Sequence, residues 1–177
     1  MNVVEIMTRD VQTIAPDDTI QTAAKLMDDL NVGILPVHDG TRVVGVITDR
    51  DITVRATSMG LSPKAHRVGD CMTEDVYYCL EEDSIEDVAQ SMAHIQIRRM
   101  PVLDHDGRLV GMISLGDIAT HASQYRTTAE ALRNISEPSQ PDRSRPAGPR
   151  LSHAPAAARA LMSASERPRP GAAGDSR

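Results

Sequence analysis

The first helix of the chain is predicted by apolar residues that recur at spacings of three and four. The apolar positions of that kind between residues 19 and 31 are Ile20, Ala23, Ala24, Met27 and Leu30. This period places their side chains on one helical face, which packs on a core. Asp18 or Thr19 is the expected N-cap, and Gly33 is expected to end the helix.

Short segments rich in β-branched side chains predict strands on both sides of this helix. They cover residues 11–14, 34–37 and 43–47. A turn over residues 38–41, which contains Gly40, predicts a hairpin between the second and third strands. The uninterrupted apolar run 43–47 predicts a strand that is buried on both faces. A second helix is expected to begin at Thr48 or Asp49.

The same order of elements occurs a second time. Residues 7–39 align without a gap with residues 72–104, and 11 of the 33 positions are identical. After a one-residue insertion the match continues, and GVITDRDI from Gly45 corresponds to GMISLGDI from Gly111. The second copy predicts strands over 76–79, 100–103 and 109–113, and helices over 84–96 and from 114 or 115 to 122. Such a duplication predicts two similar units related by a pseudo-twofold axis.

These elements divide the chain into two repeats and a tail. The repeats cover residues 3–60 and 68–122, and residues 123–136 contain one more possible helix. The tail, residues 137–177, is rich in Pro, Ala, Ser, Gly and Arg and has few large apolar residues. It is predicted to be disordered, because it buries too little apolar surface to offset the entropy of ordering. The expected fold class is α+β.

Charge and composition exclude several function classes. The chain lacks Phe and Trp, and residues 1–136 carry 12 basic and 21 acidic residues. An acidic body argues against nucleic-acid binding, which starts with the neutralisation of phosphates. The tail carries seven Arg and four acidic residues but no aromatic residue that stacks on a base. There is no leader-like N-terminus and no apolar run near 18 residues, so we expect a cytoplasmic protein without a membrane partner.

Neither a metal site nor a catalytic site is predicted. Cys71 and Cys79 are the only two cysteines and form no C-x-x-C motif. The six histidines are scattered, and a cluster of Cys79, His94 and His121 would have to arise through folding. No nucleophile is paired with a base, and P-loop and glycine-rich dinucleotide turns are missing from the sequence. We therefore expect no enzyme.

The repeated hydroxyl–carboxylate pair is the strongest candidate for chemistry. Thr48 precedes Asp51 by three residues, and Ser114 precedes Asp117 in the same way. This spacing is typical of a capping box at a helix N-terminus. The same two side chains can also accept hydrogen bonds from a vicinal diol such as a ribose, as acidic residues do in other nucleotide folds. Both interpretations remain open at this point.

The repeated unit resembles the CBS domain, on its PV strand and its terminal G-h-h-[ST]-x-x-D-h motif (h, apolar). Two copies in tandem, over about residues 3–122, resemble a CBS pair, or Bateman module. The T-D-R-D-I sequence and the Tyr77-Tyr78 pair are similar to stand-alone bacterial CBS-pair proteins of the hypoxic-response type. The resemblance implies repeats with a three-stranded sheet and two helices each, and two clefts between the repeats. It also implies an adenosine-type ligand (AMP, ADP, ATP, an NAD-type dinucleotide or S-adenosylmethionine), no catalytic cofactor, and a homodimer formed through the helices.

The resemblance also implies site residues. It assigns the ribose to Thr48 and Asp51 in one cleft and to Ser114 and Asp117 in the other. Adenine is expected against backbone and apolar atoms of Ile14, Ile34 and Pro36 in one copy and Tyr78, Arg99 and Pro101 in the other. Phosphate is expected near Arg50 and Arg55 for the first motif, and near Arg98, Arg99 and His121 for the second.

The two copies differ in charge at equivalent positions. Gly33-Ile34 of the first copy becomes Arg98-Arg99 in the second, and Asp49-Arg50 becomes Leu115-Gly116. Clefts of unlike polarity are therefore expected. The leading hypothesis is a regulatory module that senses an adenosine nucleotide, and the alternative is a ligand-free structural or protein-interaction module with an unidentified partner. Fold resemblance does not by itself decide between them.

Overall fold

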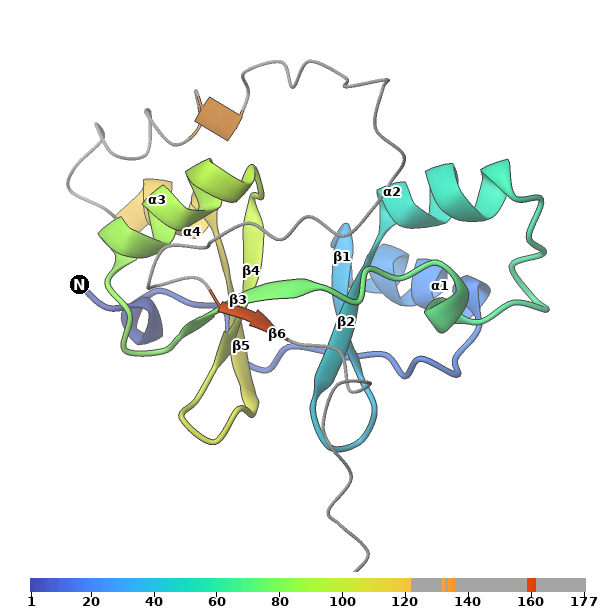
Figure 1. The fold of residues 1–177 in the computed structure, drawn as a ribbon, viewed down its shortest axis with the longest axis horizontal. Coiled ribbons are helices and arrows are strands. Elements are labelled where there is room, and N and C mark those ends of the chain that lie inside the picture. Colours follow the sequence, from blue (N-terminus) through green and yellow to red (C-terminus); the bar gives the residue numbers. More distant parts are fainter. Residues whose placement is uncertain (122–131, 133, 136–158, 162–177) are drawn as a thin grey trace, which may run out of the picture.

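Two lobes of similar architecture lie side by side in the computed structural model (Figure 1). The structure describes residues 1–121, 132, 134–135 and 159–161. The first lobe contains α1 (Ile20–Leu30), β1 (Ile34–His38), β2 (Val43–Thr48) and α2 (Asp49–Asp51), which continues as the π-helical η2 (Ile52–Ala56). The second lobe contains β3 (Val76–Leu80), α3 (Ile85–Ile95), β4 (Arg99–Leu103), β5 (Leu109–Ser114) and α4 (Leu115–His121). Mixed α+β repeats are thus confirmed.

The sheets are small, and their central ladders match between the lobes. β1 and β2 are antiparallel with Ile34 opposite Thr48, and β4 and β5 are antiparallel with Arg99 opposite Ser114. In the second lobe the strand order is β5-β4-β3-β6, in which β3 is parallel to β4 and β6 is the segment Arg159–Leu161. Thr48 therefore ends β2 opposite the first residue of β1, and Ser114 ends β5 opposite the first residue of β4.

The third strand expected in the first lobe is wrong in extent. Of residues 11–14, only Ile14 pairs with the sheet, as a single parallel bridge to Val37. The Asp18 carboxylate accepts a hydrogen bond of 2.9 Å from the Ala15 amide, and Pro16 follows. This turn directs the chain away from the sheet, because Pro16 has no N–H to continue a ladder.

Two local expectations differ from the structure. The left-handed residue after α1 is Asn31, at φ 52°, and not Gly33; Gln96 after α3 has φ 58°. Asparagine adopts this conformation readily because its short side chain bonds locally. β2 is not buried on both faces, because Val43, Gly45 and Ile47 are buried whereas the alternate residues are half-buried. At the edge of β2, Thr73 from the start of the second repeat pairs with Val46 through the backbone.

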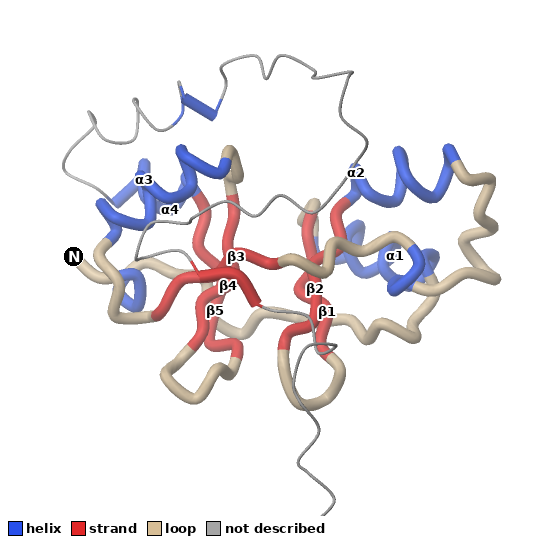
Figure 2. The backbone as a smooth tube through the Cα atoms, viewed as in Figure 1, coloured by secondary structure: helices blue, strands red, loops and turns tan. Residues whose placement is uncertain are grey.

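The segment that begins each repeat packs in the opposite lobe. The 3-10 helix η1 (Val3–Glu5) lies in the core of the second lobe, where the Val3 amide donates to the Asp83 carbonyl at 3.0 Å. Its counterpart η3 (Val68–Asp70) lies in the core of the first lobe, where the Val68 amide donates to the Asp18 carbonyl at 2.8 Å. Figure 2 shows the N-terminus beside the lobe of α3, from which a loop crosses to α1. The lobes therefore exchange segments reciprocally.

Little of the region after α4 is described. Of the helix predicted within residues 123–136, Leu132, Asn134 and Ile135 are described and are helical, and Ile135 packs against the second core. In the tail predicted to be disordered, residues 159–161 form β6 (Arg159–Leu161), antiparallel to β3. An open strand edge offers unpaired backbone groups to such a segment. The other residues of this region lie outside the described residues. No helix in the described part of the chain is both long and apolar enough to span a bilayer.

Candidate functional site

Two clefts lie between the lobes, and each contains one hydroxyl–carboxylate pair. The Thr48 cleft has a volume of about 510 Å³ and the Ser114 cleft about 380 Å³. Both are within the range of small-molecule sites. Thr48 and Asp51 share their cleft with residues of the second repeat, such as Tyr77 and Arg98. Each cleft is therefore built jointly by the two repeats.

Each pair forms a complete capping box. The Thr48 hydroxyl donates to Asp51 Oδ2 at 2.7 Å, the Thr48 amide donates to the same oxygen at 3.1 Å, and the Asp51 amide donates to Thr48 Oγ1 at 3.0 Å. Ser114 and Asp117 make the same three bonds at 2.7, 2.8 and 3.1 Å. These bonds fix the rotamers of both side chains at the start of a helix. The capping interpretation of the sequence is thus realised in both repeats.

The carboxylates keep their second oxygen for other partners. Arg55 Nε lies 3.3 Å from Asp51 Oδ1, while Asp117 Oδ1 accepts no hydrogen bond within the described part of the chain. Asp51 and Asp117 are only half-buried and line their clefts. A fixed carboxylate beside a hydroxyl at a cleft wall is suited to accept hydrogen bonds from a diol.

Arg55 holds the exchanged segment rather than lining a cleft. Its Nη1 donates to the carbonyl oxygens of Cys71 and Met72 at 3.1 and 2.9 Å, and its Nε faces Asp51. The guanidinium therefore ties the motif carboxylate to the segment that leads into the second repeat. With these donors engaged, Arg55 contributes to the positioning of Asp51.

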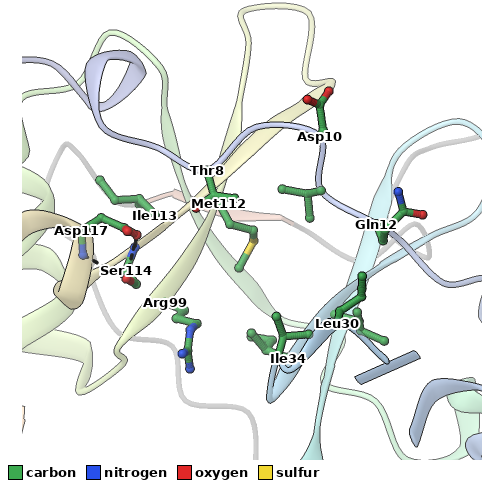
Figure 3. Close-up of a pocket in the computed structure, with 13 residues that line it drawn as sticks. Thr8, Asp10, Gln12, Leu30, Ile34, Arg99, Met112, Ile113, Ser114 and Asp117 are labelled. Atoms are coloured by element: carbon green, nitrogen blue, oxygen red, sulfur yellow. Dashed lines mark hydrogen bonds between the residues drawn. The ribbon is translucent and has the colours of Figure 1, made fainter. Parts of the chain in front are cut away.

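Three other arginines have unoccupied guanidinium groups. The side chains of Arg50, Arg98 and Arg99 make no hydrogen bond or ion pair within the described residues, and all three are exposed. All three line the Thr48 cleft, together with Asp49, Asp51 and Asp75. The Ser114 cleft contains Arg99 as its one cation among the described residues, with Asp10 and Asp117. Figure 3 shows Arg99 between Ser114 and Ile34 in this cleft.

Sequence comparisons place the two repeats in one family. The CBS domain profile matches residues 3–56 and 68–123, which include both hydroxyl–carboxylate pairs. The chain belongs to the CBS-domain family. Two such domains in tandem form a CBS pair, which is a regulatory module.

Relatives of this CBS pair include stand-alone bacterial proteins, as the sequence motifs predict. The CBS domain-containing protein YhcV of Bacillus subtilis is 39% identical over 135 residues, covering 76% of this chain and 95% of YhcV. Hypoxic response protein 1 of Mycobacterium tuberculosis is 33% identical over 122 residues, covering 68% of this chain and 85% of the relative. The resemblance to the hypoxic-response type is confirmed.

Two solved structures of similar fold contain adenosine compounds. CBSX2 of Arabidopsis thaliana, in complex with AMP, is 28% identical with a TM-score of 0.59 and covers 68% of this chain and 95% of that one. The CBS pair of the protein MJ0100, in complex with 5′-methylthioadenosine and S-adenosylmethionine, is 28% identical with a TM-score of 0.61 and covers 68% and 94%.

The CBS pair places most of the predicted site residues along its clefts. Those in the Thr48 cleft are Thr48, Arg50, Asp51, Ile34, Arg98, Arg99 and Pro101, and those in the Ser114 cleft are Ser114, Asp117, Ile34 and Arg99. Arg98, expected beside the second motif, lies instead in the cleft of the first. The reason is that each cleft combines the motif of one repeat with strand ends of the other.

Other predicted residues lie outside the cleft walls. Ile14 is 3% exposed in the first core, and Pro36 is buried in β1. Tyr78 pairs through its backbone with Arg159 of β6. His121 is exposed at the end of α4, where Nδ1 lies 2.9 Å from the Asp117 carbonyl oxygen. Arg55, bonded to the Cys71 and Met72 carbonyl groups, is likewise absent from both cleft walls as described.

Sequence reasoning missed several cleft residues that lie outside the repeated hydroxyl–carboxylate motifs. In the Thr48 cleft these include Thr73, Asp75, Tyr77 and Gln96, and in the Ser114 cleft Thr8, Asp10, Gln12 and Leu30. The available signal was the repeated Met-Thr at the start of each copy, since Thr8 and Thr73 are equivalent positions. That signal does not reveal which lobe each threonine joins.

Both cysteines are buried, and neither belongs to a metal-ligand group among the described residues. No group of three or more His, Cys, Asp and Glu side chains there is arranged to hold a metal ion. Burial raises the pKa of the Cys79 thiol to about 12, and burial also raises the pKa of Cys71. Both thiols are thus held in the protonated, unreactive form.

Proposed function

We propose that this CBS pair is a regulatory module that binds an adenosine-containing ligand in the clefts between its lobes. The observation that carries the proposal is the fixed hydroxyl–carboxylate pair at the wall of each cleft. The pairs stand where a ribose diol would donate hydrogen bonds to Asp51 or Asp117. The AMP complex of CBSX2 and the S-adenosylmethionine complex of MJ0100 support the same class of ligand.

The Thr48 cleft is the better site for a phosphorylated ligand. Arg50, Arg98 and Arg99 line it with donors that are not engaged elsewhere in the described chain. Guanidinium groups of this kind bind phosphate through paired, charge-assisted hydrogen bonds. AMP, ADP, ATP and NAD-type dinucleotides all carry such a group.

The Ser114 cleft has fewer charged side chains than the Thr48 cleft and favours the nucleoside part of a ligand. Leu30, Val32, Ile34 and Met112 are among its walls, and Leu30 and Val32 are 41% and 38% exposed. An adenine ring that covers these side chains removes apolar surface from water. Asp10 and Asp117 make the cleft compatible with an uncharged or cationic compound such as S-adenosylmethionine.

Ligand-dependent stabilisation of the full chain tests this function. Thermal unfolding is followed with AMP, ADP, ATP, NADH and S-adenosylmethionine, each in excess. A ligand at about 100 times its dissociation constant adds about 2.7 kcal/mol to the free energy of unfolding. We expect Asp51→Ala to abolish the midpoint shift caused by a ligand of the Thr48 cleft, and Asp117→Ala to abolish the shift caused by a ligand of the Ser114 cleft. A panel without any shift contradicts the proposed function.

A ligand-free interaction module is the second candidate. The capping boxes at Thr48 and Ser114 are complete without a ligand. In that case the CBS fold serves only to present surfaces to a partner, and Asp51→Ala costs stability without affecting any ligand response. In either case we propose a homodimer formed through the helices, since Val54 and Met59 are 50% and 56% exposed after α2.

A further inference from the structure

Two residues line both clefts, and they occupy equivalent positions of the repeats. Ile34 and Arg99 each contribute to the Thr48 cleft and to the Ser114 cleft. Ile34 is paired with Thr48 across β1 and β2, and Arg99 is paired with Ser114 across β4 and β5. The two side chains therefore lie where the clefts meet, next to the pseudo-twofold axis. One of the equivalent positions carries a charge, and the other does not.

We infer that Arg99 is a single guanidinium shared by the two clefts, so that an anionic ligand in one cleft weakens the binding of an anionic ligand in the other. This inference rests on the proposed function, because it requires phosphorylated ligands in the clefts. It adds a coupling between the two sites. In the first repeat the corresponding residue is Ile34, which offers no replacement charge.

The coupling follows from the uneven supply of cations. The Thr48 cleft also contains Arg50 and Arg98, whereas Arg99 is the one cation among the described walls of the Ser114 cleft. The Arg99 side chain is exposed and has no intramolecular ion pair within the described residues, so it can turn toward either cleft. A phosphate in the Thr48 cleft attracts it and leaves the Ser114 cleft with Asp10 and Asp117. A second phosphate then meets a net negative site.

Two clefts linked in this way bind two anions with different affinities although their motifs are nearly the same. Coupling free energies between sites commonly correspond to about 5- to 150-fold in affinity. By reciprocity, a phosphate in the Ser114 cleft weakens binding in the Thr48 cleft by the same factor. The two clefts therefore fill over a wider range of nucleotide concentration than the same two clefts would without the coupling.

Calorimetric titration of AMP into the full chain and three variants tests the coupling. For the wild type we expect a second binding step at least about tenfold weaker than the first. Arg99→Gln removes the second step and keeps the first, because Arg50 and Arg98 remain. Ile34→Arg supplies a second guanidinium at the equivalent position and brings the two affinities together. Arg98→Gln is the matched control: it weakens the first step and leaves the second step as in the wild type, because Arg98 lines the Thr48 cleft and not the Ser114 cleft.

The outcomes separate this inference from the proposed function. Equal and independent AMP sites in the wild type overturn the coupling alone, as does an Ile34→Arg variant that folds normally and binds AMP like the wild type. Retention of both steps in Arg99→Gln also overturns it, and this exposed position carries little folding risk. Absence of AMP binding to the wild type overturns the coupling as well, and the ligand panel then decides the proposed function separately.

Discussion

Met7 lies directly against the backbone of Gly111, in the lobe opposite to the one that its own repeat forms. A Cβ atom at Gly111 would be 2.7 Å from the Met7 sulfur and 2.8 Å from the Thr8 carbonyl oxygen. Gly45 stands in the same relation to the second copy, with 2.8 Å to the Met72 sulfur and 3.0 Å to the Thr73 carbonyl oxygen. The two most clearly repeated motifs, Met-Thr and the glycine of G-h-h-[ST], are therefore partners across the lobes.

The first prediction concerns these glycines. Gly111→Ala and Gly45→Ala should each destabilise the chain by about 1–3 kcal/mol, since the added methyl overpacks a contact with backbone that cannot turn aside. Urea unfolding measures the change. The control is Gly116→Ala in α4, where the nearest atom is 3.4 Å away and alanine should stabilise the helix by up to about 1 kcal/mol. A Gly111→Ala variant as stable as Gly116→Ala contradicts the proposed packing role.

The second prediction concerns the pH dependence of stability. The pKa of Cys79 is raised by burial, and secondarily by Asp83, from 9.0 to about 12. The unfolded chain therefore loses this proton at lower pH than the folded chain. The contribution of the protonated Cys79 thiol to stability is complete below pH 9. As the pH rises from there toward 12, the free energy of unfolding falls by up to about 1.4 kcal/mol per pH unit. Urea unfolding of wild type and Cys79→Ala isolates this contribution, because other alkaline titrations are common to both. Parallel pH profiles contradict it.

The third prediction concerns the cap at Thr48. Thr48→Ala removes the acceptor for the Asp51 amide and the donor to its carboxylate, so it should cost about 1 kcal/mol. Thr48→Ser keeps the hydroxyl that Ser114 uses in the other repeat and should be nearly neutral. Chemical unfolding compares the two. A serine variant as unstable as the alanine variant would point to the lost methyl group instead of the cap.

The fourth prediction separates a positioning arginine from a ligand-facing one. Arg55→Gln loses bonds to the Cys71 and Met72 carbonyl groups and should destabilise the chain by about 1–2 kcal/mol. Arg98→Gln should leave stability unchanged and weaken AMP binding in the Thr48 cleft. Unfolding and titration calorimetry on both variants decide this. If Arg55→Gln weakens AMP without any loss of stability, Arg55 acts on the ligand.

The fifth prediction concerns assembly. Val54 and Met59 are exposed apolar residues after α2, and in a homodimer formed through the helices they would be covered. Val54→Glu with Met59→Glu should then shift the chain from dimer to monomer in sedimentation velocity. Gln90→Glu, at an exposed polar position of α3, adds charge without this effect. A wild type that sediments as a monomer at all concentrations contradicts the homodimer.

Local elements followed from the sequence because their causes are local. The spacing of Ile20, Ala23 and Met27 gave α1, and all three are buried. The Thr48 and Asp51 spacing predicted the cap that the structure contains. Errors arose where the two lobes meet: β2 was expected to be buried on both faces, but Val46 and Thr48 on its half-buried face line the Thr48 cleft.

The composition of the clefts could not be read from sequence. A residue was expected beside the motif of its own repeat, which placed Arg98 with Ser114 and Arg55 with the phosphate. Because each cleft lies between the lobes, Tyr77 and Arg98 of the second repeat line the Thr48 cleft instead. Arg55 binds carbonyl groups that only the folded chain brings near it.

The sequence by itself determined the duplication, the family, the order of helices and strands, and the two hydroxyl–carboxylate pairs. Periodicity, capping and repetition act over a few residues or one repeat length, so they can be read along the chain. Only the tertiary structure decided which lobe each leading segment joins and which arginines face which cleft. Packing of Met7 on Gly111 and of Met72 on Gly45 fixes that exchange through close contacts between residues far apart in sequence, and the position of Arg99 where the clefts meet follows from it.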